Sequence, residues 1–152
     1  MSDLLARVKW KSVLALVLLI AAIVLVLWAL YGLKPFQASY KGVGDVQARF
    51  WVEPPKTGPK GTTTVWVEVK NKGQDTRNVS VSLESYSKSL LFETKEQKIS
   101  KDVEIGSGES RQLPFKASLN ASYGGRYGMK AVVSPGGENI EEELFIEVFE
   151  KQ

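Results

Sequence analysis

The chain has 152 residues, a formal net charge of +3, and neither cysteine nor histidine. The missing side chains exclude disulfides, thiol nucleophiles, imidazole bases and metal sites that need nitrogen or sulfur ligands. Residues 34–152 carry 17 basic and 16 acidic side chains, because Arg7, Lys9, Lys11 and Asp3 lie before them. Such a balanced segment lacks the basic surface that follows a phosphate backbone, so no nucleic-acid partner is expected.

An uncharged stretch of 22 residues lies between Lys11 and Lys34. As a helix, residues 12–33 would be about 33 Å long, which matches the roughly 30 Å hydrocarbon core of a bilayer. Aromatic residues near its two ends, Trp10 and Tyr31, are typical of membrane interfaces. A cleaved signal peptide, the main alternative, would have a shorter apolar region and a small-x-small cleavage site. The pattern therefore predicts a retained signal-anchor helix that crosses the membrane once.

The charges beside this helix predict its orientation. Basic residues cluster on its N-terminal side at Arg7, Lys9 and Lys11. Basic flanks are retained on the cytoplasmic side of a membrane, so residues 1–11 are predicted to be cytoplasmic. The chain beyond residue 33 is then predicted to be extracytoplasmic.

Within the predicted helix, alanines recur every seven residues at Ala15, Ala22 and Ala29. Small residues on one face allow a second helix to approach closely, so these three are candidates for a helix–helix contact. The alternative is the ordinary alanine content of a membrane anchor, since no GxxxG pattern accompanies them.

Residues 34–45 mix Pro, Gly and polar side chains and predict a stalk, followed by a domain over residues 46–150. The domain alternates apolar and polar residues, which is typical of half-buried strands. The apolar sets are Val46, Ala48, Phe50 and Val52; Val65, Val67 and Val69; Val79, Val81 and Leu83; Ile99, Val103 and Ile105; Leu113, Phe115, Ala117 and Leu119; Tyr127, Met129, Ala131 and Val133; and Leu144, Ile146 and Val148. Seven strands, or eight if residues 90–94 pair, predict an all-β, immunoglobulin-like antiparallel β-sandwich.

One tyrosine near the start of a predicted strand has a specific structural interpretation. The sequence Gly125-Arg126-Tyr127 fits a tyrosine corner, in which the hydroxyl of Tyr127 bonds back to the backbone across a connection between sheets. An ordinary strand tyrosine is the alternative.

Three turn and strand patterns carry a resemblance to a known family. They are a strand ending in Asn71-Lys72-Gly73, a Gly-Glu-Ser strand start at residues 108–110, and the Gly-x-Tyr of residues 125–127. Over roughly residues 46–150 the chain resembles the CARDB-type immunoglobulin-like domains of bacterial and archaeal surface proteins. The resemblance implies an adhesive, spacer or assembly module.

Two tryptophans break the alternation of the predicted strands. Trp51 and Trp66 occupy positions where the pattern calls for polar, outward-facing residues, on strands joined by a Pro/Gly loop. If these strands pair, the indoles are neighbours on one outer face and form a candidate interaction patch. The alternative is that each covers a sandwich edge or packs under the loop of residues 54–61.

Other surface features concern modification and charge. Asn78 and Asn120 begin N-x-[ST] sequons and are candidate glycosylation acceptors on an extracytoplasmic domain. The last segment is acidic, with Glu138, Glu141, Glu142, Glu143, Glu147 and Glu150. Charge on a final strand is typical of protection against edge-to-edge aggregation, and the spacing lacks the pattern of a calcium loop.

No catalytic motif occurs, so the sequence predicts a protein without enzymatic activity or cofactor. Two functions are compatible with the predicted architecture. The first is a membrane-tethered module for adhesion or cell-envelope structure, with a protein or an envelope polymer as partner. The second is an accessory subunit of a larger membrane or surface-filament complex, such as an archaellum stator or a secretion assembly. The sequence does not decide between them, nor does it predict the oligomeric state.

Overall fold

The computed structural model describes residue 19 and residues 38–149. Several predictions fall outside the described residues. They are the cytoplasmic segment 1–11, the span 12–33 except for residue 19, and the helix–helix contact of Ala15, Ala22 and Ala29. Within the described part of the chain, no helix is long and apolar enough to cross a membrane.

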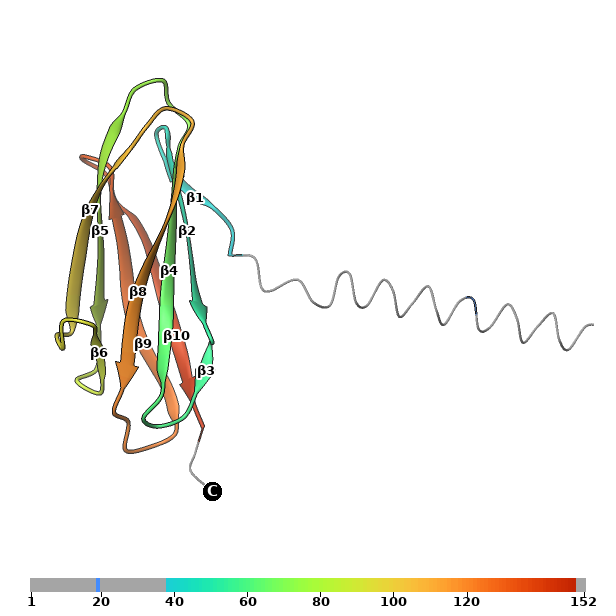
Figure 1. Cartoon of the computed structure of the whole chain (residues 1–152), viewed down its shortest axis with the longest axis vertical. Coiled ribbons are helices and arrows are strands. Elements are labelled where there is room, and N and C mark those ends of the chain that lie inside the picture. Colours follow the sequence, from blue (N-terminus) through green and yellow to red (C-terminus); the bar gives the residue numbers. More distant parts are fainter. Residues whose placement is uncertain (1–18, 20–37, 150–152) are drawn as a thin grey trace, which may run out of the picture. The chain divides into compact units, whose positions relative to one another are not determined.

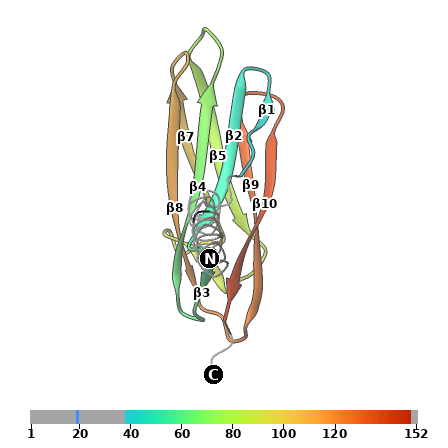
Figure 2. The ribbon, with the colours of Figure 1, turned by 90° about the vertical axis from the view of Figure 1, so that its right-hand side faces the viewer.

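Residues 38–149 form two sheets with ten strands (Figures 1 and 2). The strands are β1 (Lys41–Val43), β2 (Val46–Glu53), β3 (Lys56–Thr57), β4 (Thr62–Asn71), β5 (Arg77–Ser85), β6 (Leu90–Phe92), β7 (Lys98–Ile105), β8 (Ser110–Leu119), β9 (Gly125–Ser134) and β10 (Ile140–Val148). One sheet has the order β1-β2-β4-β8-β6, and we call it the first sheet. The second sheet has the order β3-β10-β9-β5-β7. The predicted β-sandwich is confirmed.

The seven long strands that alternation predicts are β2, β4, β5, β7, β8, β9 and β10, and β6 is the eighth. The two further strands are short. β1 pairs with β2 and lies inside residues 34–45, so the first sheet begins at Lys41 rather than near Val46. β3 follows Pro54 and Pro55 and pairs in parallel with the end of β10, at Lys56 and Glu147. The chain therefore passes from the first sheet to the second sheet between β2 and β3.

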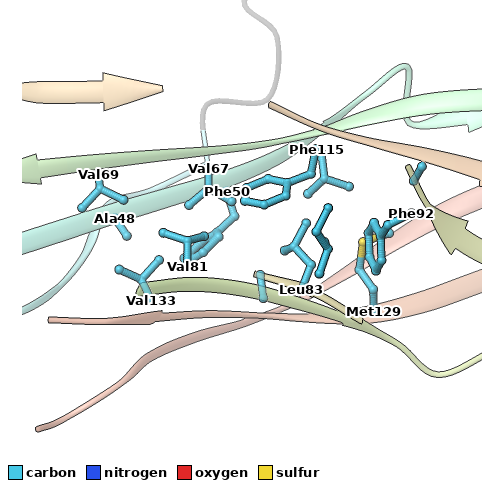
Figure 3. Close-up of a cluster of buried hydrophobic side chains, with 14 of the residues drawn as sticks. Ala48, Phe50, Val67, Val69, Val81, Leu83, Phe92, Phe115, Met129 and Val133 are labelled. Atoms are coloured by element: carbon cyan, nitrogen blue, oxygen red, sulfur yellow. The ribbon is translucent and has the colours of Figure 1, made fainter. Parts of the chain in front are cut away.

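The core lies between the sheets and uses the inward-facing residues of both (Figure 3). Ala48, Phe50 and Val67 of the first sheet face Val81 and Leu83 of the second sheet. Among residues 38–149, the buried hydrophobic side chains lie between Val46 and Val148, because strand alternation turns every second side chain inward. Five predicted inward residues are only partly buried: Val52, Val103, Leu113, Tyr127 and Leu144.

A buried asparagine joins two turns at one end of the sandwich. Asn71 is 0 % exposed, and its Nδ2 donates to the carbonyls of Asp75, Ile105 and Gly106 at 2.7, 3.1 and 3.2 Å. Its Oδ1 accepts a hydrogen bond from the backbone N–H of Gly73 at 2.9 Å. Asn71 therefore connects the turn after β4 with the turn after β7. These two turns carry two of the three patterns behind the family resemblance, and their role in the structure is to hold this end together.

Candidate binding face

The two tryptophans predicted as neighbours lie directly opposite each other on the outer face of the first sheet. Trp51 of β2 pairs in register with Trp66 of β4. Their ring centroids are 6.0 Å apart and their planes differ by 11°. Each indole is partly exposed. Both indoles therefore lie partly exposed on the outer face, in a stacked arrangement that is favourable for aromatic rings.

An arginine extends this stack toward the start of the domain. The guanidinium carbon of Arg49 lies 5.2 Å from the ring centroid of Trp51 and 5.1 Å from that of Tyr40. A guanidinium over an aromatic ring is attracted by the negative face of that ring. Tyr40, Arg49, Trp51 and Trp66 therefore form a row of four planar groups, which we call the aromatic row.

A nearly buried carboxylate fixes the arginine. Glu68 is 8 % exposed, and it forms a salt bridge with the Nε of Arg49. Its other oxygen accepts a hydrogen bond from the hydroxyl of Ser110 at 2.8 Å. Burial raises the pKa of Glu68, but the hydrogen bonds from Ser110, Arg49 and Tyr40 together outweigh it and hold this pKa below its usual value. Glu68 therefore stays ionised and anchors the row.

The pKa of Tyr40, the tyrosine of the aromatic row, shifts in the opposite direction to that of Glu68. Burial, followed by its hydrogen bond to the Glu68 carboxylate, raises the pKa of Tyr40. Because Tyr40 precedes β1, the contact between its ring and the Arg49 guanidinium ties the start of the domain to the outer face of the first sheet.

A shallow groove of about 510 Å³ lies on the same face, next to the tryptophans. Its polar lining is Glu53, Thr62, Thr63, Thr64, Glu93, Lys116 and Ser118. The strand register explains the proximity, because Thr64 is paired with both Glu53 and Lys116 and lies two residues before Trp66 on β4. One wall is held by a salt bridge of 3.2 Å between Glu93 and Lys101.

The outer face of the second sheet has a different character. Exposed aromatic rings of Tyr86 and Phe145 lie on either side of Gly128, where an added Cβ would be 3.1 Å and 3.2 Å from them. The guanidinium carbon of Arg126 lies 4.3 Å from the ring centroid of Phe145. Salt bridges join the acidic residues of β10 to lysines in the pairs Lys41–Glu142, Lys56–Glu147 and Lys130–Glu141.

Four carboxylates of β10 have partners within the described part of the chain. Among residues 38–149 no group of three carboxylates is arranged to hold a metal ion. Glu143, another acidic residue of β10, accepts a hydrogen bond from the Tyr86 hydroxyl at 3.2 Å. Glu150 lies outside the described residues.

The predicted tyrosine corner is confirmed. The hydroxyl of Tyr127 donates to the backbone carbonyl of Tyr123 at 2.9 Å, across the connection between β8 and β9. The two sequon asparagines are both exposed, Asn78 on β5 and Asn120 directly after β8. Their side chains are accessible, and their modification stays a prediction.

Sequence reasoning found the tryptophans but missed three members of the site. Arg49 and Glu68 share the outward positions of their strands with Trp51 and Trp66, so the pairing of β2 with β4 was the signal that could have placed them together. Tyr40 gave no such signal, because it precedes a three-residue strand that is too short to show alternation.

No family model matches the chain, and no curated protein matches its sequence. Solved structures share its fold. A FixG-related protein from Vibrio parahaemolyticus has a TM-score of 0.52 at 11 % identity, covering 70 % of this chain and 98 % of its own. The native α2-macroglobulin of E. coli has a TM-score of 0.57 at 17 % identity over 71 % of this chain, and the alkylpurine DNA glycosylase AlkC of Pseudomonas fluorescens has 0.51 at 12 % over 69 %. The matched parts are 7 % and 30 % of those two longer chains. At such identities the likeness concerns the β-sandwich alone.

Proposed function

We propose that this chain is a membrane-tethered, extracytoplasmic module of immunoglobulin-like and CARDB-like type, without enzymatic activity. It binds a partner through the outer face of the first sheet, as an adhesive or structural component of the cell envelope. The tether is the predicted span of residues 12–33. The immunoglobulin-like assignment is supported by the strand orders β2-β4-β8 and β10-β9-β5, which follow the ABE and GFC orders of that class.

The observation that carries the binding proposal is the Trp51–Trp66 pair. Indoles in the middle of an outer sheet face keep apolar surface in contact with water, which is unfavourable for an isolated domain. Tryptophan and arginine are enriched among residues that dominate binding interfaces. Here Trp51, Trp66 and Arg49 are adjacent and held in place by Glu68.

Site-specific photo-crosslinking in native membranes tests this proposal. A photo-reactive amino acid at Gln112 would lie on the proposed face, since Gln112 is exposed and paired with Glu68. The matched control is Ser100, exposed on β7 of the second sheet. We expect discrete adducts from position 112 that disappear with Trp51→Ser and Trp66→Ser, and none from position 100.

The kind of adduct separates the two functions considered for this architecture. A polydisperse polymer adduct supports an envelope module, and a single protein of fixed stoichiometry supports an accessory subunit of a larger complex. Equal adducts from both positions would contradict the proposal that this face binds the partner. Adducts that persist after the tryptophans are replaced would contradict it as well.

A further inference from the structure

We propose that the groove beside Trp66 is a binding site for a neutral, hydroxyl-rich ligand, namely a short stretch of a glycan chain. This inference rests on the proposed function, because it names the class of partner that the outer face of the first sheet binds. The proposed ligand is a neutral glycan rather than a protein, an anionic polymer or a lipid surface.

The strand register places the groove and the tryptophans in successive rows across the face. One row contains Trp51, Trp66 and Pro114, and the following row contains Glu53, Thr64 and Lys116. Thr62 and Ser118 form the third row. Residues two apart on one strand are about 7 Å apart along it. A ligand lying along β4 can therefore touch the Trp66 indole and the polar groove at once.

The side chains of the groove match the hydrogen-bonding needs of a sugar. The hydroxyls of Thr62 and Thr64 can donate and accept, as a sugar hydroxyl does. The hydroxyl of Ser118 donates to the carbonyl of Leu91 at 3.3 Å and can still accept. Glu53 and Glu93 add acceptors, and Lys116 adds a donor. The volume of about 510 Å³ is within the range of small-molecule sites.

Two of these groups are available for a ligand. Among residues 38–149, neither Glu53 nor Lys116 forms a salt bridge. By contrast, the hydroxyl of Thr63 donates to the carbonyl of Pro54 at 2.7 Å and is committed to the fold. The groove thus combines a fixed floor with free donors and acceptors at its opening.

The indoles supply the second half of the recognition. A sugar ring has an apolar C–H face, which packs on the flat surface of an aromatic side chain while its hydroxyls reach neighbouring polar groups. The aromatic row holds Trp51 and Trp66 in fixed orientations through Arg49 and Glu68. Fixed side chains lose little conformational entropy on binding.

Charge favours a neutral ligand. The charged residues of this face and groove nearly balance: Arg49, Lys70, Lys101 and Lys116 against Glu53, Glu68 and Glu93. The outer face of the second sheet has an acidic excess: Glu84, Asp102, Glu104, Glu141, Glu143 and Glu147 against Lys56, Lys98, Arg126 and Lys130. In the groove itself Glu93 is paired with Lys101, which leaves Glu53 and Lys116 as one pair of opposite charges. The groove therefore offers no cluster of positive charge for an anionic polymer or an anionic lipid surface.

The test uses the full chain in mild detergent micelles and a panel of neutral oligosaccharides that contains β-glucan, chitin, mannan and galactan fragments. Titration calorimetry measures binding to each fragment. Thr64→Val with Lys116→Met removes a hydroxyl and a charge from the groove and leaves both tryptophans in place. Ser100→Ala with Lys98→Met removes the same groups from the second sheet as a matched control.

We expect binding of at least one neutral fragment, a loss of about tenfold or more in the groove variant, and unchanged binding in the control variant. Equal binding by the groove variant would overturn the site. Binding only to heparin or to phosphatidylglycerol vesicles would overturn the ligand class.

The photo-crosslinking at Gln112 separates this inference from the proposed function. If no fragment binds while adducts from position 112 persist, the glycan site is wrong and the binding face stands. If no fragment binds and position 112 gives no adducts, both proposals fall.

Discussion

The indole rings of Trp51 and Trp66 face each other across the β2–β4 pair, with 6.0 Å between their centroids. Strand alternation assigns both positions to polar residues, so the pair is the clearest departure of this sandwich from its own pattern. Its partial exposure makes a specific prediction about stability. The core lies within residues 46–148, so we expect residues 38–152 to fold when produced alone, and stability is measured on this fragment.

Replacing either tryptophan by serine should destabilise residues 38–152 by about 1–2 kcal/mol, less than the 3–5 kcal/mol typical of a fully buried aromatic residue. The double variant should lose less than the sum, because the stacked pair contributes an interaction of about 0.5–1.5 kcal/mol that can be lost only once. Urea unfolding of the four proteins measures this. Additive losses would show that the rings do not interact in solution.

Glu68→Gln should make the free energy of unfolding less dependent on pH in the acidic range. The folded protein lowers the pKa of Glu68 below its ordinary value of 4.5, so the unfolded chain binds a proton more readily. The ionised carboxylate therefore stabilises the fold above about pH 4.5, and this contribution is lost as the pH falls through the folded pKa. The variant should lose about 1–3 kcal/mol at pH 7, the usual value of charge-assisted hydrogen bonds.

Thermal unfolding of both proteins between pH 7 and pH 3 measures the effect. We expect the two midpoints to converge as the solution becomes more acidic. A constant difference across this range would mean that Glu68 is not the titrating partner of Arg49. Glu84→Gln is a suitable control, because Glu84 is exposed and lies 3.8 Å from Lys98.

Tyr127→Phe should cost about 1 kcal/mol, because it removes the hydroxyl that donates to the carbonyl of Tyr123 and leaves the ring in place. Tyr123→Phe is a matched control. Tyr123 is 80 % exposed and takes part through its backbone, so its own hydroxyl can be removed without effect. Equal midpoints for all three proteins would show that the corner does not contribute to stability.

Asn71→Ala should be the most destabilising of these changes, at about 2–4 kcal/mol. It deletes a fully buried amide and leaves the carbonyls of Ile105 and Gly106 without that donor. Asn71→Asp should cost at least as much, because a carboxylate cannot donate to these carbonyls. Asn78→Ala, at an exposed position, should change little. A small effect of Asn71→Ala would mean that water replaces the amide.

The long strands were predictable because each one buries a face, and burial imposes alternation over eight to ten residues. β1 and β3 were not, since strands of three and two residues show no period. Lys101 illustrates another limit. It shares the parity of Ile99 and Ile105, yet its long side chain reaches the edge of the core and places its Nζ 4.6 Å from the ring centroid of Phe115.

Strand alternation predicted the tryptophans of the binding face but not the residues that contact them. Outward parity places Trp51 and Trp66 together once their strands pair. The row that continues through Arg49 to Tyr40 depends on contacts between side chains, and alternation carries no information about which outward residues meet. The groove depends likewise on the register of three strands, which no local pattern of the sequence specifies.

The central claim, an extracytoplasmic module tethered by residues 12–33, has one direct test. The chain has no cysteine, so a single introduced cysteine is the only thiol. Ser100→Cys lies on an exposed position away from the proposed binding face, and Ser2→Cys lies in the predicted cytoplasmic segment. A membrane-impermeant maleimide is added to intact, wall-stripped cells and, separately, to lysed cells. We predict labelling at position 100 in intact cells and labelling at position 2 only after lysis. Protection of position 100 until lysis would contradict the account.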